Sequence, residues 1–292
     1  MEKNLTTTII LRTFKCIPLP LRRWFFTFLF LLVYHLISRQ RLITLHNLRR
    51  AFPEKPLPEI IRIAKGAYRH LGLVAADFFE IPWITRENLH EWVEFEGLMH
   101  YREALERNKG VLSIVAHFGN WEMQAVVFPL VAEPTCIVYR PLDSPILDNL
   151  LGWVRSLQGN VLIGKEGAGR KIIRALRQNR IVGILSDQNV ATREGVFVDF
   201  FGRPACTGIG LAALAMGSGA PVLPFFMPRM ADGRYKFMVL PPVAVDDTGD
   251  YERDLVTNTQ RFTEVIEEMV RQYPEQWFWL HQRWKTKNCQ VE

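Results

Sequence analysis

The residues best suited to chemistry in this 292-residue sequence are a histidine and a glutamate five positions apart, His117 and Glu122, in the segment HFGNWE. A neutral imidazole accepts a proton from a hydroxyl at neutral pH, and a carboxylate on its other nitrogen stabilises the imidazolium that forms. On a regular helix two such residues lie about 140° apart and do not meet. Gly119 and Asn120 favour a turn and a helix N-cap, so we expect His117 in a loop, Glu122 in the first helical turn, and contact between the two.

The position of this pair along the chain favours catalysis. The segment VLSIVA at 111–116 directly precedes His117 and is typical of a buried strand. In open parallel sheets, ligands bind beyond the carboxyl ends of the strands. The alternative is a structural histidine that is satisfied by a backbone group at the start of a helix. The pattern therefore indicates a general base acting on an alcohol.

A second polar cluster, Ser-Asp-Gln-Asn, follows the apolar run at 181–185. Asp187 lies near His117 if the two strands are neighbours in the sheet. In that case Asp187 orients the histidine in place of Glu122, or it accepts hydrogen bonds from a sugar-like hydroxyl. The alternative is an Asx turn that caps the following loop.

An arginine occupies the end of a third predicted strand, at 135–139. Arg140 is a candidate for binding phosphate or for stabilising an oxyanion. A solvated arginine before the turn at Pro141 is the alternative.

The elements that must position these residues alternate between strands and helices. Apolar runs of strand length occur at 111–116, 135–139, 181–185 and 222–226, and helical stretches separate them at 121–132, 144–158, 167–179 and 207–218. We expect an edge strand at 235–240 and amphipathic helices at 59–80 and 251–272. This alternation predicts an α/β fold in which a mostly parallel sheet is flanked by helices.

An apolar run of 14 residues at 24–37 precedes this domain and has basic residues at both ends. It is shorter than the ~20 residues that cross a bilayer. We expect a helix that enters or lies in one leaflet, with a thin transmembrane span and a buried core helix as alternatives. The predicted organisation is a membrane anchor at 1–45 and a catalytic domain at 46–292.

Composition excludes several classes of protein. The chain is 48% hydrophobic and carries a net charge of +6, which excludes general disorder and indicates an anionic partner. The four cysteines form no C-x-x-C pair, so neither a metal site nor a redox motif is expected. The segment GKEGAGRK at 164–171 lacks the Lys-Ser/Thr of a phosphate loop. We expect no nucleic-acid partner, and the basic helix that follows either meets an anionic membrane or acidic carrier protein or is a solvated face.

Four motifs together resemble the bacterial lipid A biosynthesis acyltransferases, the late lauroyl and myristoyl transferases within the lysophospholipid acyltransferase superfamily. The resemblance spans about 47–285 and rests on HFGNWE at 117–122, Asp187-Gln188, GVFVDFFG at 195–202 and PEQWFWLHQRWK at 274–285. It implies that His117 is the general base and that Glu122 supports it. It also identifies 46–292 as the acyltransferase domain.

The resemblance implies transfer of an acyl chain from an acyl carrier protein, or from coenzyme A, to a hydroxyl of a lipid A precursor, without metal or cofactor. The implied partners are an anionic membrane glycolipid and the carrier protein, with the catalytic domain on the cytoplasmic face of the inner membrane. The expected substrate-binding residues are Asn120, Arg140, Asp187, Gln188 and Arg203. Phe200, Phe201 and the segment 208–220 either line the acyl channel or pack as buried structure.

Other readings of the same residues stay open. The acceptor is alternatively a different glycolipid or a lysophospholipid. With water in place of an alcohol, His117 and Glu122 would make the protein an ester or thioester hydrolase. A third alternative is a catalytically silent membrane protein that binds lipid or carrier protein.

Overall fold

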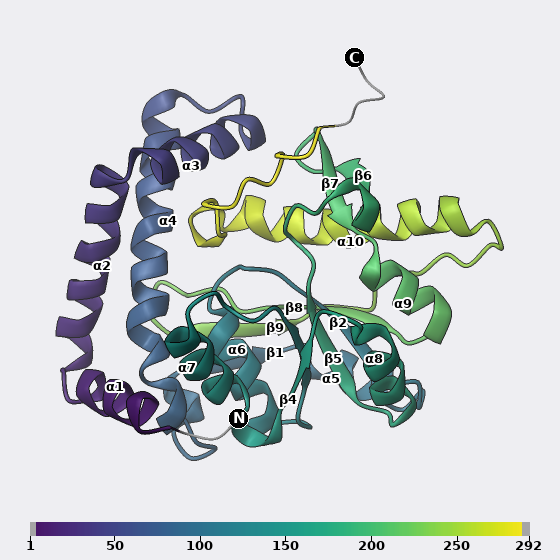
Figure 1. Ribbon diagram of the computed structural model, residues 1–292, viewed down its shortest axis with the longest axis horizontal. Coiled ribbons are helices and arrows are strands. Elements are labelled where there is room, and N and C mark those ends of the chain that lie inside the picture. The colour runs from purple at the N-terminus through teal and green to yellow at the C-terminus, as the bar shows by residue number, and fades with distance from the viewer. Residues whose placement is uncertain (1–3, 288–292) are drawn as a thin grey trace.

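A seven-stranded sheet of order β1-β9-β8-β2-β5-β3-β4 forms the centre of the molecule (Figure 1), in a computed structural model that describes residues 4–287. Its strands are β1 (Val93–Glu96), β2 (Val111–Val115), β3 (Cys136–Tyr139), β4 (Val161–Gly164), β5 (Ile181–Leu185), β8 (Val222–Phe226) and β9 (Tyr235–Val239). Every neighbouring pair runs parallel except β8 and β9. The predicted α/β fold with a mostly parallel sheet is confirmed.

The sheet differs from the prediction at both of its edges. The segment at 235–240 was expected at an edge, but β9 lies between β8 and β1, which pairs with it in parallel. The sequence of β1, Val-Glu-Phe-Glu, is short and half charged, so it carries no apolar run. At the other edge, β4 adds a strand directly before the segment that resembles a phosphate loop.

A two-stranded antiparallel hairpin lies outside the main sheet and consists of β6 (Gly195–Asp199) and β7 (Pro204–Gly208). The helix predicted at 207–218 therefore begins only at Gly210, as α9 (Gly210–Ser218). Residues 204–208 are extended because they pair with β6.

Helices cover both faces of the sheet and bury two apolar clusters. One face carries α8 (Ala168–Arg177), α9 and α10 (Tyr251–Gln272), together with the inner side of α4 (Leu57–Phe78). The other face carries α5 (Leu98–Leu105), α6 (Trp121–Val127) and α7 (Pro145–Arg155). In β2, Leu112 and Ile114 point to the first cluster and Val111 to the second, as the two-residue period of a strand requires.

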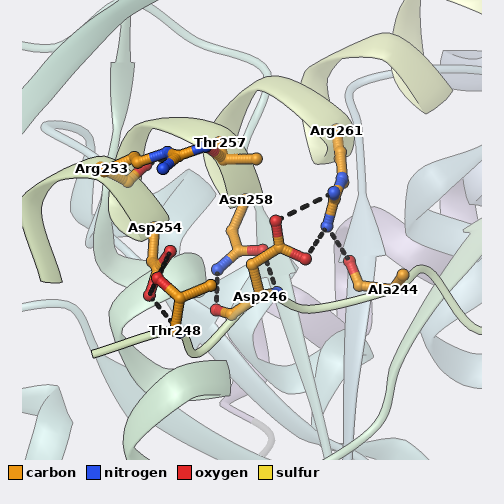
Figure 2. A network of polar contacts seen from close by, with 8 residues as sticks. All are labelled: Ala244, Asp246, Thr248, Arg253, Asp254, Thr257, Asn258 and Arg261. Carbon is orange, nitrogen blue, oxygen red and sulfur yellow. Dashed lines mark hydrogen bonds and ion pairs between the residues drawn. The ribbon is translucent and has the colours of Figure 1, made fainter. Parts of the chain in front are cut away.

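Polar side chains hold the segment before α10 against that helix (Figure 2). Asn258 pairs with the backbone of Asp246 through two hydrogen bonds of 2.8 Å, and Arg261 binds the Asp246 carboxylate. Thr248 donates from its backbone and hydroxyl to the buried Asp254. These hydrogen bonds hold the irregular connection between β9 and α10 in place.

Three N-terminal helices, α1 (Leu5–Lys15), α2 (Leu19–Leu36) and α3 (Ser38–Ala51), lie beside α4 (Figure 1). Close packing brings Gly72 of α4 against the backbone of α2, where a Cβ would lie 2.7 Å from the Thr27 Cα. Two ion pairs tie α2 to the end of α4 and the residues after it: Arg23 binds Asp77 at 2.7 Å, and the buried Arg22 binds Glu80. The apolar run at 24–37 is thus the main part of a helix that packs on α4.

The opposite side of α2 exposes a continuous apolar stripe, formed by Leu21, Trp24, Phe25, Phe28, Leu29, Leu32 and Leu36. Between residues 4 and 287, no single helix has the length and apolar character for crossing a bilayer. The pair α1 and α2 meets those two requirements jointly, with a bend of 106° between them. Of the four cysteines, Cys16, Cys136 and Cys206 are free thiols, and Cys289 lies outside the described residues.

Candidate active site

His117 and Asp187 meet where two adjacent strands end. The strands β2 and β5 pair in parallel with Val115 opposite Leu185, so the residues two positions beyond each strand emerge together. The His117 ring Nδ1 lies 2.8 Å from one Asp187 oxygen, and the His117 backbone N–H donates to the other at 3.0 Å. The prediction that Asp187 lies near the histidine is confirmed.

Asp187 is buried and accepts a third hydrogen bond, from the Trp277 indole N–H at 2.8 Å. Burial acts to raise the pKa of this carboxyl. The charge of His117 and the N–H bonds from His117 and Trp277 outweigh burial and hold the pKa below its usual value. Asp187 is therefore an ionised acceptor, which requires the proton of a neutral His117 ring to sit on Nδ1.

This tautomer leaves Nε2 of His117 as the free basic atom. The imidazole side chain is 21% exposed and is flanked by the rings of Trp121 and Phe278, at 5.6 and 6.1 Å between centroids. The Phe278 backbone N–H donates to the His117 carbonyl at 2.9 Å. A base oriented by a buried carboxylate and open on its other side can take a proton from a hydroxyl group.

The loop after His117 is held from three directions. Gly119 has a φ of +59°, and a Cβ there would lie 2.0 Å from the Met227 carbonyl oxygen, so glycine is required. The side chain of Asn120 is buried and caps α6 by accepting from the Met123 N–H at 3.0 Å. Asn120 was predicted to bind substrate, but in the structure its side chain caps helix α6.

A second histidine supports this loop from α4. His70 Nε2 lies 3.0 Å from the Gly119 carbonyl oxygen. Burial lowers the pKa of His70 to about 4, so the ring is neutral at pH 7 and its Nε2–H donates to Gly119. Nothing in the spacing of the sequence pointed to this contact across 49 residues.

Glu122 binds an arginine where contact with His117 was expected. Arg155 of α7 donates to its two carboxylate oxygens at 2.8 and 2.5 Å, and the Trp121 indole donates at 3.0 Å. Glu122 does lie in the first turn of α6, as predicted, but its carboxylate is directed to α7. Arg155 was missed. The sequence does hold one signal for it, because Arg155 is a basic residue next to the apolar stripe of the helix predicted at 144–158.

An apolar pocket lies between one face of the sheet and α6. Its cavity volume is about 70 Å³, and the pocket is partly open to solvent. Val115 and Leu185, two residues before His117 and Asp187, line it together with Trp121, and Phe225 and Phe237 line it deeper in the molecule. Glu122 and Arg155 form the ionic part of its wall. The pocket therefore has the imidazole near one end and aromatic rings at the other.

The other predicted substrate-binding residues lie on the surface or beside the pair. Arg140 is exposed after β3, and Gln188 is half-buried directly after Asp187. Arg203 is exposed in the turn of the β6–β7 hairpin, where its Nε–H donates to the Arg50 carbonyl at 3.2 Å. Phe200 and Phe201 are not part of the pocket. They are buried in the other core cluster, against Trp277, Trp279 and Phe52.

The segment 274–284 brings further groups to the pair that residue spacing did not predict. His281 accepts a hydrogen bond from the Asn189 N–H at 2.9 Å, and burial lowers its pKa. Arg283 is fully buried and donates to the Cys206 carbonyl at 3.0 Å; desolvation lowers its pKa to about 10 against the opposing effect of Asp187. The sequence signal for these groups is the concentration of aromatic and basic residues in WFWLHQRW.

Comparison with known proteins gives one family and several relatives. The family described as bacterial lipid A biosynthesis acyltransferase matches residues 5–286. The lipid A biosynthesis lauroyltransferase of Escherichia coli K12 is 29% identical over 253 residues, which cover 86% of this chain and 81% of the relative. A lipid A biosynthesis acyltransferase of Haemophilus influenzae is 28% identical over 95% of this chain and 88% of its own length.

A relative with a different name has the same degree of similarity. The phosphatidylinositol mannoside acyltransferase of Mycobacterium tuberculosis H37Rv is 29% identical over 253 residues, covering 82% of this chain and 75% of the relative. These proteins share an acyltransferase name, whereas the glycolipid in the name differs.

Proposed function

Because the chain belongs to the bacterial lipid A biosynthesis acyltransferase family and is an acyltransferase, we propose that it moves a fatty acyl chain from an acyl thioester to a hydroxyl of a lipid A precursor. The observation that carries this proposal is the His117–Asp187 pair next to an apolar pocket. A hydroxyl-activating base and a site for a hydrocarbon chain are the two parts that such a reaction needs.

The reaction begins at Nε2 of His117, which removes the proton of the acceptor hydroxyl. The oxygen forms a bond to the thioester carbonyl carbon, and Asp187 stabilises the imidazolium that results. When the tetrahedral intermediate collapses, the carbon–sulfur bond breaks and the imidazolium returns its proton to the thiolate. The products are an ester and a free thiol, and no acyl-enzyme forms.

The pocket receives the acyl chain with the carbonyl near His117. Its lining is mostly apolar, and the Glu122–Arg155 pair, Ser113, Gln124 and Thr135 add polar atoms. Glu122 then acts by holding Arg155 in the wall of the pocket, which replaces the expected contact between Glu122 and the imidazole. The exposed Arg140 is suited to the charged part of a substrate at the same edge of the sheet.

The exposed side of α2 supports membrane attachment. Its stripe of seven exposed apolar side chains, two of them phenylalanine and one tryptophan, is suited to burial in one leaflet. The helices α1 and α3 flank it with exposed basic residues such as Arg12, Arg39 and Arg49, which suit anionic headgroups. We place the protein on the cytoplasmic face of the inner membrane, where it meets both a membrane glycolipid and an acyl carrier protein.

The test is mass spectrometry of total lipids from a Gram-negative host that lacks its own late acyltransferase and expresses this protein or His117→Ala. The expected result is lipid A that gains the mass of one acyl chain only with the intact histidine. If a different glycolipid gains the acyl chain, that glycolipid is the acceptor in place of lipid A. The similarity to a phosphatidylinositol mannoside acyltransferase is a reason to look for this outcome. Release of free fatty acid without any gain would contradict acyl transfer and favour hydrolysis.

A further inference from the structure

A single helix carries most of the net charge of the chain. Residues 165–180, which contain α8, hold six basic side chains and one acidic side chain, a net charge of +5, whereas the whole chain has +6. Within α8, Arg170, Arg174 and Arg177 lie at intervals of four and three, so they share the outer face of the helix. The opposite face of α8 carries Ile172, Ala175 and Leu176, which are buried against the sheet.

The cations on this face have no partners of opposite charge. Arg170, Lys171, Arg174 and Arg177 are all exposed, and none of the four forms an ion pair within residues 4–287. On the surface Arg170, Arg174 and Arg177 border a shallow groove together with Gly169 and Gln178. Four unpaired cations along about two turns of one helix repel one another, a cost that an anionic partner removes.

The position of α8 relates this face to the edge of the sheet that carries the active site. The helix follows β4, whose carboxyl end lies beside the carboxyl end of β3, and β3 pairs with β5. His117 follows β2, three strand positions from β4, or ~14 Å across the sheet. The first turn of α8, which contains Arg170 and Lys171, is thus at the edge where Asp187 and His117 emerge.

The character of this face favours a soluble anionic partner over a bilayer. No large apolar side chain is exposed between 165 and 180, so the face has nothing to insert into a membrane. The exposed apolar stripe is on α2, at the left of the molecule in Figure 1, whereas α8 lies at the right, beyond the sheet. When α2 lies on a membrane, α8 is directed away from it.

We propose that the outer face of α8 is the docking surface for an acidic carrier protein, which presents its acyl thioester at the carboxyl edge of the sheet. This inference rests on the proposed function and extends it by locating the donor. Long-range attraction between opposite charges speeds encounter and is weakened by salt. These arginines should therefore affect how tightly and how fast the carrier-bound donor binds, and they should leave the rate of the chemical step unchanged.

The experiment compares two donors, an acyl carrier protein charged with lauroyl and lauroyl-pantetheine, which has no phosphate and no protein. The variant Arg170→Glu/Arg174→Glu/Arg177→Glu is expected to raise KM for the acyl carrier protein about 10-fold or more and to remove its salt dependence. With lauroyl-pantetheine, its rate is expected to equal that of the wild type. The matched control, Arg86→Glu/Arg102→Glu/Arg107→Glu, makes the same change in net charge at exposed sites elsewhere and should behave as wild type.

The outcomes separate the docking surface from the proposed function. If the wild type uses both donors and the α8 variant is unchanged with the carrier protein, the docking proposal is wrong and the acyl transfer stands. If neither donor supports transfer by the wild type, the proposed function fails first. Loss of flotation with anionic phospholipid vesicles in the α8 variant, with normal use of the carrier protein, would make this face a membrane contact instead.

Discussion

Two buried carboxylates lie beside the same pocket, and they have different partners. Asp187 binds an imidazole, a backbone N–H and an indole N–H, whereas Glu122 binds the guanidinium of Arg155 and an indole. An imidazole gains and loses a proton near neutral pH, but a guanidinium stays charged. A carboxylate beside the first can assist proton transfer, and a carboxylate beside the second forms a fixed ion pair.

These contacts support a role in proton transfer for Asp187 and a role in packing for Glu122. The HFGNWE segment by itself points to Glu122 as the partner of the histidine, and the structure places a different acid there. Substitutions on the two sides should consequently differ in kind: those at the His117–Asp187 pair reduce the rate, and those at the Glu122–Arg155 pair reduce stability.

Loss of the base should have the largest effect. We expect His117→Ala to lower kcat by about 10⁴-fold, the upper range for general base catalysis, because the free Nε2 is removed. The melting temperature should stay near that of the wild type, since the side chain is partly exposed at a strand end. Initial rates with an acyl thioester and a lipid A precursor measure the first effect, and thermal unfolding measures the second. A rate within tenfold of wild type would contradict the mechanism.

Asp187→Asn should lower kcat by about 10³-fold while KM changes little. An amide fills the same volume but cannot stabilise the imidazolium, and its NH₂ competes with the Nδ1–H that sets the tautomer. The measurement is kcat and KM for both substrates. A matched substitution, Glu122→Gln, is the control, and an equal loss of kcat in the two variants would remove the distinction between the carboxylates.

Glu122→Gln should act mainly on the free energy of unfolding. It leaves the mostly buried Arg155 without its anionic partner, at a cost of about 3 kcal/mol. The double variant Glu122→Gln/Arg155→Met removes both charges and should recover much of that loss, because an apolar side chain of similar volume replaces the guanidinium. Urea unfolding of the three proteins tests this. A double variant less stable than Glu122→Gln alone would show that Arg155 has other stabilising contacts.

The smallest effect is a dependence of stability on pH at Asp187. Its pKa is below the usual value in the folded protein, so its contribution to stability is present above the unfolded pKa of about 3.9 and is lost as pH falls through the folded pKa. The difference in unfolding free energy between wild type and Asp187→Asn should therefore shrink as the pH falls below about 4. A difference that stays unchanged from about pH 5 down to about pH 2 would contradict an ionised Asp187.

Much of the site could be predicted because it depends on strands. VLSIVA and the run at 181–185 identify two buried strands, and polar residues directly after such strands emerge at one edge of a parallel sheet. That reasoning found His117 and Asp187. Arg155, His70 and His281 were missed, because each reaches the site from a helix or a C-terminal segment whose position depends on packing.

The sequence by itself determined the α/β alternation, the strand-end histidine, the N-cap at Asn120 and the family of the protein. These follow from local periodicity and from residues that are close in the chain. Only the tertiary structure decided which carboxylate faces the imidazole, because β2 and β5 become neighbours through pairing between segments 70 residues apart. Packing of α6 against α7 likewise turned Glu122 to Arg155, and no spacing along the chain encodes the contact between two helices that the core brings together.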